Sequence, residues 1–356
     1  IKANGLTHAN ESAIEYASIQ LPQILNPHLG YLSTVKSNQS ADFSAWPWRN
    51  ADSMEIKRLE SILKDDSQST DEKKYTWEAL IATSNTDALE VASQYIANIK
   101  DREESDRDFF NMYSMAEGFE WEGKEFNKLY NDETYHLCFP KVYFENLEDS
   151  WIADVYDDHP TWYQCKQSES NSQIEVEFGG AVESKCGVCG EKLHGLVSLE
   201  TIPENLGVSG LGKFSLVTCL SCLSWEEYTL SFQHESNGSV ESLDIKDNKV
   251  EPEFPAVPLV KIKLSIKQLN KRWSFQSWGS SNSRENLNRI GGQPSWIQDA
   301  EYESCPKCDK TMKFLVQLDS ELPTEDHDEW LWGSGGILYV LWCDDCKIST
   351  TLLQCT

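Results

Sequence analysis

Eight cysteines occur as four CxxC pairs, a residue type and spacing that bind metal ions. The pairs are Cys186 and Cys189, Cys219 and Cys222, Cys305 and Cys308, and Cys343 and Cys346. Each pair spans a tight turn that aims two thiolates at one ion, and a second pair completes a tetrahedron of four sulfurs. The order of the pairs predicts two four-cysteine sites that resemble zinc ribbons. Zinc is the expected ion, and iron is the alternative.

Disulfide bonds and thiol redox chemistry are the other uses of paired cysteines. The chain has 11 cysteines, an odd number, and its first residues lack the apolar core of a signal peptide, so a secreted disulfide framework is disfavoured. A redox CxxC acts as a single pair at the start of a helix, which four pairs in register do not match. Cys138, Cys165 and Cys355 lie outside the four pairs.

The two predicted metal sites lie in segments that resemble each other. Residues 186–200 align without gaps with 305–319, and residues 214–222 align with 338–346. The first alignment matches both cysteines and three apolar positions, and the second matches its cysteines and apolar residues. A Gly-Gly pair also precedes each segment, at Gly179 and Gly180 and at Gly291 and Gly292. The pattern predicts an internal duplication in which each copy holds one ion.

The residues before these segments are predicted to form helices. Apolar residues recur at helical spacing in 10–21, 54–63, 73–83 and 87–99, and Ser53 and Thr86 are the expected N-caps of the second and fourth of these helices. From residue 101 to 158 the chain has 17 acidic and 5 basic residues with interleaved aromatics. Its first part, 101–125, is expected to be either a solvated connector or an acidic, aromatic docking surface.

After residue 135 the apolar residues alternate with the period of two that is typical of strands. Strands are predicted at 136–139, 141–144, 173–178, 227–233 and 259–269, a loop at 159–162, and an extended proline-rich linker at 249–258. The predicted fold class is α+β. A helical domain with an acidic connector (1–130) precedes a first β-rich zinc-binding unit (131–245) and a second one (246–356).

The C-terminal residues resemble the bacterial YwqG-like family. Three motifs carry the similarity: GGQPSWIQ at 291–298, MKFLVQLD at 312–319 and WGSGGILY at 332–339. Ser334 stands where the family often has Asp in the third motif, and residues 1–115 lie outside the similarity. The resemblance implies a β-rich fold with a duplicated core and a role as an immunity protein beside a polymorphic toxin. It also implies kinship with eukaryotic cysteine-knuckle chaperones of a basic ribosomal protein.

Charge and motif content exclude several functions. The chain has 58 acidic and 31 basic residues, a formal charge of −27, which would repel phosphate and disfavours nucleic acid as a partner. No apolar stretch is long enough to span a membrane. A zinc ion held by four cysteines has no open position, and no HExxH, GxSxG or P-loop motif occurs, so neither an enzyme nor a small-molecule substrate is expected.

The predicted function is that of a cytoplasmic immunity protein that binds and neutralises a cationic toxin, for example a nuclease, through an acidic surface. Complementary charge accelerates such an association. The expected contact residues are Glu325, Asp326, Asp328, Glu329 and Trp330, for which a solvated hairpin tip is the alternative interpretation. The alternative function is that of a chaperone or adaptor for a basic client protein.

Overall fold

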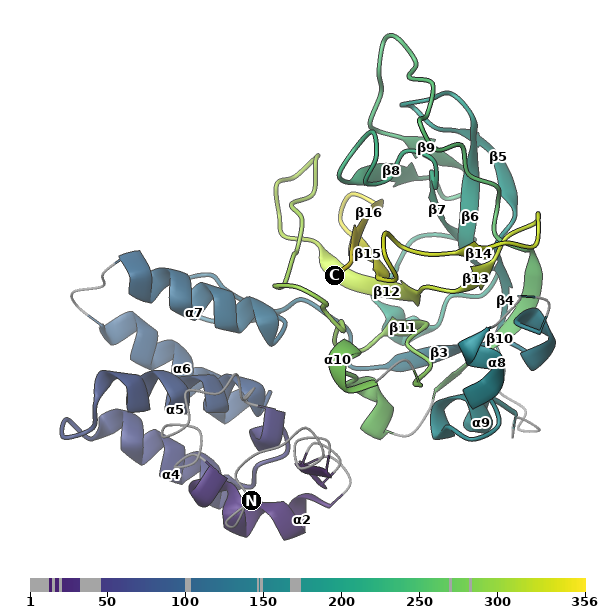
Figure 1. Cartoon of the computed structure of the whole chain (residues 1–356). Helices are drawn as coiled ribbons and strands as arrows, with labels where there is room; N and C mark the ends of the chain where they lie inside the picture. Colours follow the sequence, from purple (N-terminus) through teal and green to yellow (C-terminus); the bar gives the residue numbers. More distant parts are fainter. Residues whose placement is uncertain are drawn as a thin grey trace. The chain divides into compact units, whose positions relative to one another are not determined.

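The computed structural model describes residues 13–14, 17–18, 21–32, 46–99, 104–145, 147, 150–166, 174–268, 271–281 and 284–356. The chain divides into two units, Ile1–Lys128 and Leu129–Thr356. Figure 1 shows helices in the first unit, in purple and blue, and a large sheet in the second, in teal to yellow. The expected order, a helical part before a β-rich region with two four-cysteine groups, is therefore confirmed.

The described part of the first unit contains helices followed by a β-hairpin. Its elements are α2 (Pro22–Leu25), η1 (Asn26–His28), η2 (Trp46–Trp48), α4 (Ser53–Lys64), α5 (Thr70–Ala82), α6 (Thr86–Asn98), α7 (Glu104–Ala116), β1 (Phe119–Trp121) and β2 (Phe126–Lys128). Trp77 of α5 is fully buried, and its indole N–H donates to the Ala92 carbonyl of α6 at 3.1 Å. Its ring also lies 4.7 Å from that of Phe110 on α7, so one tryptophan joins three helices.

The apolar spacing predicts α4, α5 and α6 correctly, but the two predicted N-caps are each one residue late. Ser53 and Thr86 are the first helical residues, and the caps are Asp52 and Asn85. Each cap side chain accepts two backbone N–H groups, a role for which carboxylate and amide oxygens are well suited. The helix predicted at 10–21 falls mostly outside the described residues.

The aromatic residues of the acidic stretch pack inside the protein. Phe110 on α7 is 5% exposed and Phe119 on β1 is 1% exposed. All seven aromatic side chains between residues 109 and 130 are buried or partly buried. The segment 101–125 therefore uses its aromatic residues for packing, and its described part presents no exposed aromatic anchor to a partner.

The second unit is built on one antiparallel sheet of 12 strands within the described residues. The strand order is β5-β6-β4-β10-β3-β11-β12-β15-β16-β8-β9, and β7 pairs with β6. The strands are β3 (Thr134–Cys138), β4 (Ile174–Phe178), β5 (Ala181–Lys185), β6 (Lys192–Leu199), β7 (Phe214–Thr218), β8 (Leu230–His234), β9 (Val240–Ser242), β10 (Ile262–Gln268), β11 (Arg289–Gly291), β12 (Lys313–Asp319), β15 (Ile337–Cys343) and β16 (Ile348–Gln354). A separate hairpin is formed by β13 (Leu322–Pro323) and β14 (Glu329–Trp330). The short helices are η3 (Lys141–Tyr143), α8 (Trp151–Val155), α9 (Pro160–Lys166), η4 (Glu204–Leu206), η5 (Lys271–Ser274) and α10 (Trp278–Ser281).

Two sequence predictions for the segment 141–166 are wrong. The strand predicted at 141–144 is the helical turn η3, which buries Tyr143 and Phe144 together, whereas a strand would point them to opposite faces. The loop predicted at 159–162 is instead the start of α9. Pro160 occupies the first position of α9, where its fixed backbone angle suits a helix.

Strand β15 shows why the C-terminal apolar run is continuous rather than alternating. Every residue from Ile337 to Cys343 is buried. Leu338 and Val340 belong to the main core, whereas Tyr339 and Leu341 belong to a second core on the other face of the sheet. Because apolar cores cover both faces of β15, apolar residues are favoured at successive positions of the strand.

The two cysteine-bearing segments share one pattern of strand pairing. Phe178 of β4 pairs with Val197 of β6, and Ile290 of β11 pairs with Val316 of β12. Val197 and Val316 are equivalent in the sequence alignment, and Phe178 and Ile290 each directly precede a Gly-Gly pair. The register shifts at equivalent places too, between residues 195 and 197 in β6 and between 314 and 316 in β12.

The Gly-Gly pairs end β4 and β11 with backbone angles that require glycine. Their φ angles lie between +72° and +79°. A Cβ on Gly179 would lie 2.5 Å from the Val260 carbonyl oxygen, and one on Gly291 would lie 2.1 Å from that of Glu133. Both contacts are too short, so the two pairs bend the chain where another strand crosses closely.

Cys138 and Cys165, which the sequence analysis left without a partner, form a disulfide bond. Their Cα atoms are 5.2 Å apart, and the bond ties α9 to β3 across 27 residues. Sequence reasoning missed this pair because the two cysteines lie in different elements and share no motif. The eight CxxC cysteines and Cys355 are free.

We expect Cys165→Ser to lower the free energy of unfolding of the second unit by about 3 to 4 kcal/mol, because it frees a loop in the unfolded chain. The measurement is the urea midpoint of the oxidised protein. Cys355→Ser, which removes a free thiol, is the matched control. Equal midpoints for Cys165→Ser and the wild type, or a wild-type mass showing both thiols reduced, would contradict the prediction.

Candidate metal centre

The eight CxxC cysteines form two clusters, as the sequence predicts. Within each cluster the four Sγ atoms lie within 4.8 Å of one another. Cys186 Sγ and Cys222 Sγ are 4.0 Å apart, and Cys189 Sγ and Cys219 Sγ are 3.8 Å apart. A tetrahedral zinc ion with bonds of about 2.3 Å separates its sulfurs by about 3.8 Å. We call the cluster of Cys186, Cys189, Cys219 and Cys222 the first cage.

The second cage consists of Cys305, Cys308, Cys343 and Cys346. Cys308 Sγ and Cys343 Sγ are 3.7 Å apart, again a distance that fits one shared ion and is too long for a disulfide bond. The donor set and spacing of both cages therefore suit a tetrahedral thiophilic cation.

The turns that carry the first cysteine pair of each cage have the same hydrogen bonds. Cys186 N–H donates to the Glu191 carbonyl at 2.8 Å, and Cys305 N–H donates to that of Lys310 at 2.8 Å. The residue after each pair, Gly190 or Asp309, has a positive φ and donates back to the first cysteine at 2.9 Å. Both turns thus close in the same way and aim two sulfurs at one point.

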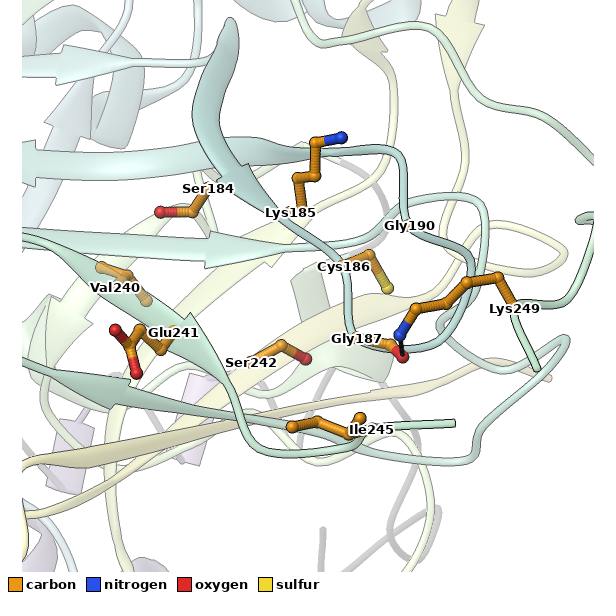
Figure 2. A pocket seen from close by; sticks show the side chains of 10 residues that line it. All are labelled: Ser184, Lys185, Cys186, Gly187, Gly190, Val240, Glu241, Ser242, Ile245 and Lys249. Carbon is orange, nitrogen blue, oxygen red and sulfur yellow. Dashed lines mark hydrogen bonds between the residues drawn. The ribbon is translucent and has the colours of Figure 1, made fainter. Parts of the chain in front are cut away.

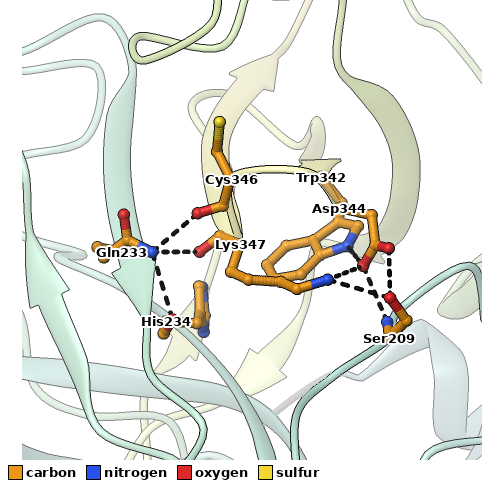
Figure 3. Close-up of polar contacts among 7 residues, drawn as sticks. All are labelled: Ser209, Gln233, His234, Trp342, Asp344, Cys346 and Lys347. Carbon is orange, nitrogen blue, oxygen red and sulfur yellow. Dashed lines mark hydrogen bonds and ion pairs between the residues drawn. The ribbon is translucent and has the colours of Figure 1, made fainter.

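The second pair of the second cage is held by Gln233 on the neighbouring strand β8 and by Ser209 in the loop before β7 (Figure 3). The Gln233 amide on β8 donates to the carbonyls of Cys346 at 2.9 Å and Lys347 at 3.2 Å. Asp344 accepts from the Ser209 N–H at 2.8 Å and pairs with Lys347 at 2.8 Å. The second cage is therefore positioned by contacts across the whole β-rich unit.

The cages differ in exposure. All four cysteines of the first cage are buried, whereas Cys308 and Cys346 of the second are partly exposed. Hydrogen bonds from Cys219 and Cys222 lower the pKa of Cys186, and the hydrogen bond to Cys186 raises the pKa of Cys219. Neighbouring thiols thus oppose one another's ionisation, so four thiolates together need a cation to compensate their charge.

His194 positions the first cage without being a ligand. Its Nδ1 accepts the Leu220 N–H at 3.1 Å, inside the turn between Cys219 and Cys222, and its Nε2 lies 3.4 Å from the Ala256 carbonyl. Accepting at Nδ1 places the proton on Nε2, and burial lowers the pKa of the ring. The sequence shows His194 near a knuckle but does not reveal this contact.

The proline-rich segment 249–258 lies against the first cage. Val250 N–H donates to the Val188 carbonyl at 3.1 Å, and Ala256 N–H donates to Ser221 Oγ at 2.9 Å. One cysteine pair is contacted at each end, so the segment braces both turns of the cage.

An open hollow of about 350 Å³ lies beside the first cage (Figure 2). It is lined by Ser184, Lys185, Cys186, Gly187, Gly190, Val240, Glu241, Ser242, Ile245 and Lys249. The ammonium group of Lys249 donates to the Gly187 carbonyl at 2.5 Å, as Figure 2 shows. The positive charge of the Lys249 side chain is thus held against the turn that follows Cys186.

The predicted contact residues lie on the hairpin of β13 and β14. Glu325, Asp326, Asp328 and Glu329 are exposed, whereas Trp330 is partly buried and meets Trp332 edge to face at 5.7 Å. Asp326 Oδ1 accepts the Thr324 hydroxyl at 2.5 Å, which shapes the turn. The structure brings the four carboxylates together and assigns Trp330 to the packing of the hairpin.

The residues that carry the family resemblance form a buried polar network. Arg289 is fully buried, and its guanidinium donates to Ser295 Oγ at 2.9 Å and to Gln317 Oε1 at 3.1 Å. Burial lowers the pKa of Arg289 to about 9. Ser295 lies in the first motif and Gln317 in the second, so these motif residues hold neighbouring segments together.

Two carboxyl groups at the base of the hairpin also escaped the sequence analysis. Burial raises the pKa of Asp319 to about 7, and burial with the charges of Glu329 and Asp319 raises that of Glu321 to about 8. Both folded-state pKa values lie above the ordinary values of 3.8 and 4.5, so protonation of these carboxyls favours folding. That contribution is fully present below about pH 4 and is lost as the pH rises from there to 7 to 8.

Comparison with known proteins gives one partial similarity. The chain is 39% identical over 71 residues to the uncharacterized protein YpfL of Salmonella typhimurium, which covers 20% of this chain and 15% of the Salmonella protein. No protein-family model matches the sequence, and no solved structure matches it. Among the described residues, no helix is both long and apolar enough to cross a membrane.

The second cage should release its ion before the first, because two of its sulfurs reach solvent. We expect about two ions per chain and two phases of release into a chromogenic chelator. Cys308→Ser should remove the fast phase and Cys186→Ser the slow one, with Cys355→Ser as the control. A single phase that both cage variants reduce equally contradicts this order.

His194→Ala should weaken ion binding at the first cage by about 10- to 100-fold, because it leaves the Leu220 N–H without its acceptor. The measurement is chelator competition in a Cys308→Ser background, in which the first cage alone is intact. His194→Asn should recover part of the affinity, since its amide oxygen replaces Nδ1. Equal affinities for wild type and His194→Ala would show that the contact has no effect on the ion.

Proposed function

We propose that this protein is a non-enzymatic immunity protein that binds and neutralises a cationic toxin, for example a nuclease, in the cytoplasm. The observation that carries the proposal is the excess of 58 acidic over 31 basic residues on a scaffold fastened by two four-cysteine cages. A rigid anionic surface attracts a cationic protein at long range and covers a cleft that would otherwise bind phosphate.

Zinc is the ion that we assign to both cages. It accepts four thiolates in a tetrahedron, and such a centre has no position left for water or substrate. Each loaded cage carries a formal charge of about −2, from four thiolates and one dication, and so adds to the negative charge of the protein. A structural role for the ions agrees with a function in binding rather than catalysis.

We further infer that the β-rich unit arose by duplication and is related to the YwqG-like family. The equivalent pairs Phe178 with Val197 and Ile290 with Val316 support this history, as do the matching register shifts and Gly-Gly pairs. The family resemblance favours the immunity role, because the bacterial members of that family accompany polymorphic toxins.

The hairpin carboxylates are the first candidate contact with the toxin. Reversing Glu325, Asp328 and Glu329 to Lys, with Asp326 kept because it shapes the turn, should weaken toxin binding and abolish protection of cells that express the toxin. Reversing Asp66, Asp71 and Glu90 in the helical unit changes the net charge equally and is the control. If the hairpin variant binds the toxin as tightly as the control variant does, the hairpin is excluded as a contact with the toxin.

The runner-up function is a chaperone or adaptor for a basic client, which the same acidic surface would suit. The two functions differ in what the protein protects. An immunity protein rescues cells from a toxin encoded beside its gene, whereas a chaperone keeps a basic client in solution and gives no such rescue.

A further inference from the structure

Three large aromatic side chains are exposed beside the first cage. Trp225 is 55% exposed, Tyr228 58% and Phe254 47%. The rings of Trp225 and Phe254 are 4.4 Å apart at an angle of 43° and therefore form one platform. Exposed aromatic clusters of this kind mark binding surfaces, because aromatic side chains anchor protein interfaces.

Both segments that carry the platform form hydrogen bonds with residues of the first cage's second turn. The N–H groups of Trp225 and Glu226 donate to the Cys222 carbonyl at 3.2 and 2.9 Å, and Ser224 turns the chain there with a φ of +63°. Phe254 lies two residues before Ala256, whose N–H donates to Ser221 Oγ at 2.9 Å. The segments that carry both rings are thus hydrogen-bonded to the turn that holds Cys219 and Cys222, which limits the conformational entropy they lose when a partner binds.

The platform is surrounded by carboxylates. Its two segments read WEEY (225–228) and EPEF (251–254), with four acidic residues and no basic one. Glu226 Oε1 accepts the Glu253 N–H at 3.3 Å, which joins the segments. Glu227 pairs with Lys246, and the Tyr228 hydroxyl donates to Glu301 at 2.6 Å. We call residues 225–228 and 251–254 the aromatic–acidic surface.

We propose that the aromatic–acidic surface binds an arginine- or lysine-bearing segment of the partner protein. A guanidinium stacks on the indole and phenyl faces while neighbouring carboxylates pair with it, and both interactions favour a cation. Nucleic acid bases also stack on aromatic rings, but the carboxylates of this surface repel their phosphates. The inference rests on the proposed binding of a cationic partner, and it does not require that the partner be a toxin.

The test uses the full metal-loaded chain and a fluorescein-labelled octa-arginine peptide. Trp225→Ala with Phe254→Ala should weaken peptide binding about tenfold, and Glu226→Lys with Glu253→Lys at least as much. Tyr163→Ala removes an aromatic residue that is 47% exposed on α9 and should leave binding unchanged. Metal content and the urea midpoint check that each variant is folded. If the double aromatic variant fails these checks, Phe254→Ala alone is tested in its place, because this side chain lies in an exposed segment outside the strands.

Three results would overturn the proposal. They are unchanged peptide binding in the folded aromatic variants, an equal loss in Tyr163→Ala, and tighter binding of a single-stranded oligonucleotide than of the peptide. If the aromatic variants still protect cells from a toxin and bind it with wild-type affinity, this surface is wrong and the proposed function stands. If the wild-type protein gives no protection from a toxin but binds the peptide through this surface, the proposed function is wrong and the aromatic–acidic surface stands.

Discussion

Repulsion among clustered thiolates is the constraint on which the β-rich unit depends. Four sulfurs within 4.8 Å of one another are stable as thiolates only around a cation. The described residues place such a group of four sulfurs at two positions. An ion that binds the folded arrangement and not the unfolded chain would contribute its binding energy directly to folding.

The hydrogen bonds around the cages show how one local site stabilises distant segments. Gln233 on β8 fastens the turn at Cys346, and His194 on β6 fastens the turn at Leu220. The proline-rich segment contacts both turns of the first cage. An ion bound in each cage would therefore fix strands and loops that lie far apart in the sequence.

A scaffold fixed in this way is free to present surface residues that contribute little to stability. The carboxylates of the β13–β14 hairpin are exposed, and so are the rings of Trp225 and Phe254. Net negative charge destabilises a compact chain by self-repulsion, and metal binding at the two cages would offset this cost. The buried carboxyls of Asp319 and Glu321 follow the opposite rule, since burial favours their protonated forms.

The sequence alone determined the ligands of both cages, the helices α4 to α6 and most strands, because cysteine spacing and apolar periodicity are local properties. Tertiary structure alone decided the rest. Cys138 meets Cys165 only when α9 packs on β3, and Tyr143 and Phe144 form a turn because both find space in one core. His194 and the platform of Trp225 and Phe254 join residues separated by 26 and 29 positions, that is 220 − 194 and 254 − 225. No local pattern encodes such contacts, because they depend on where the sheet and its ions place each segment.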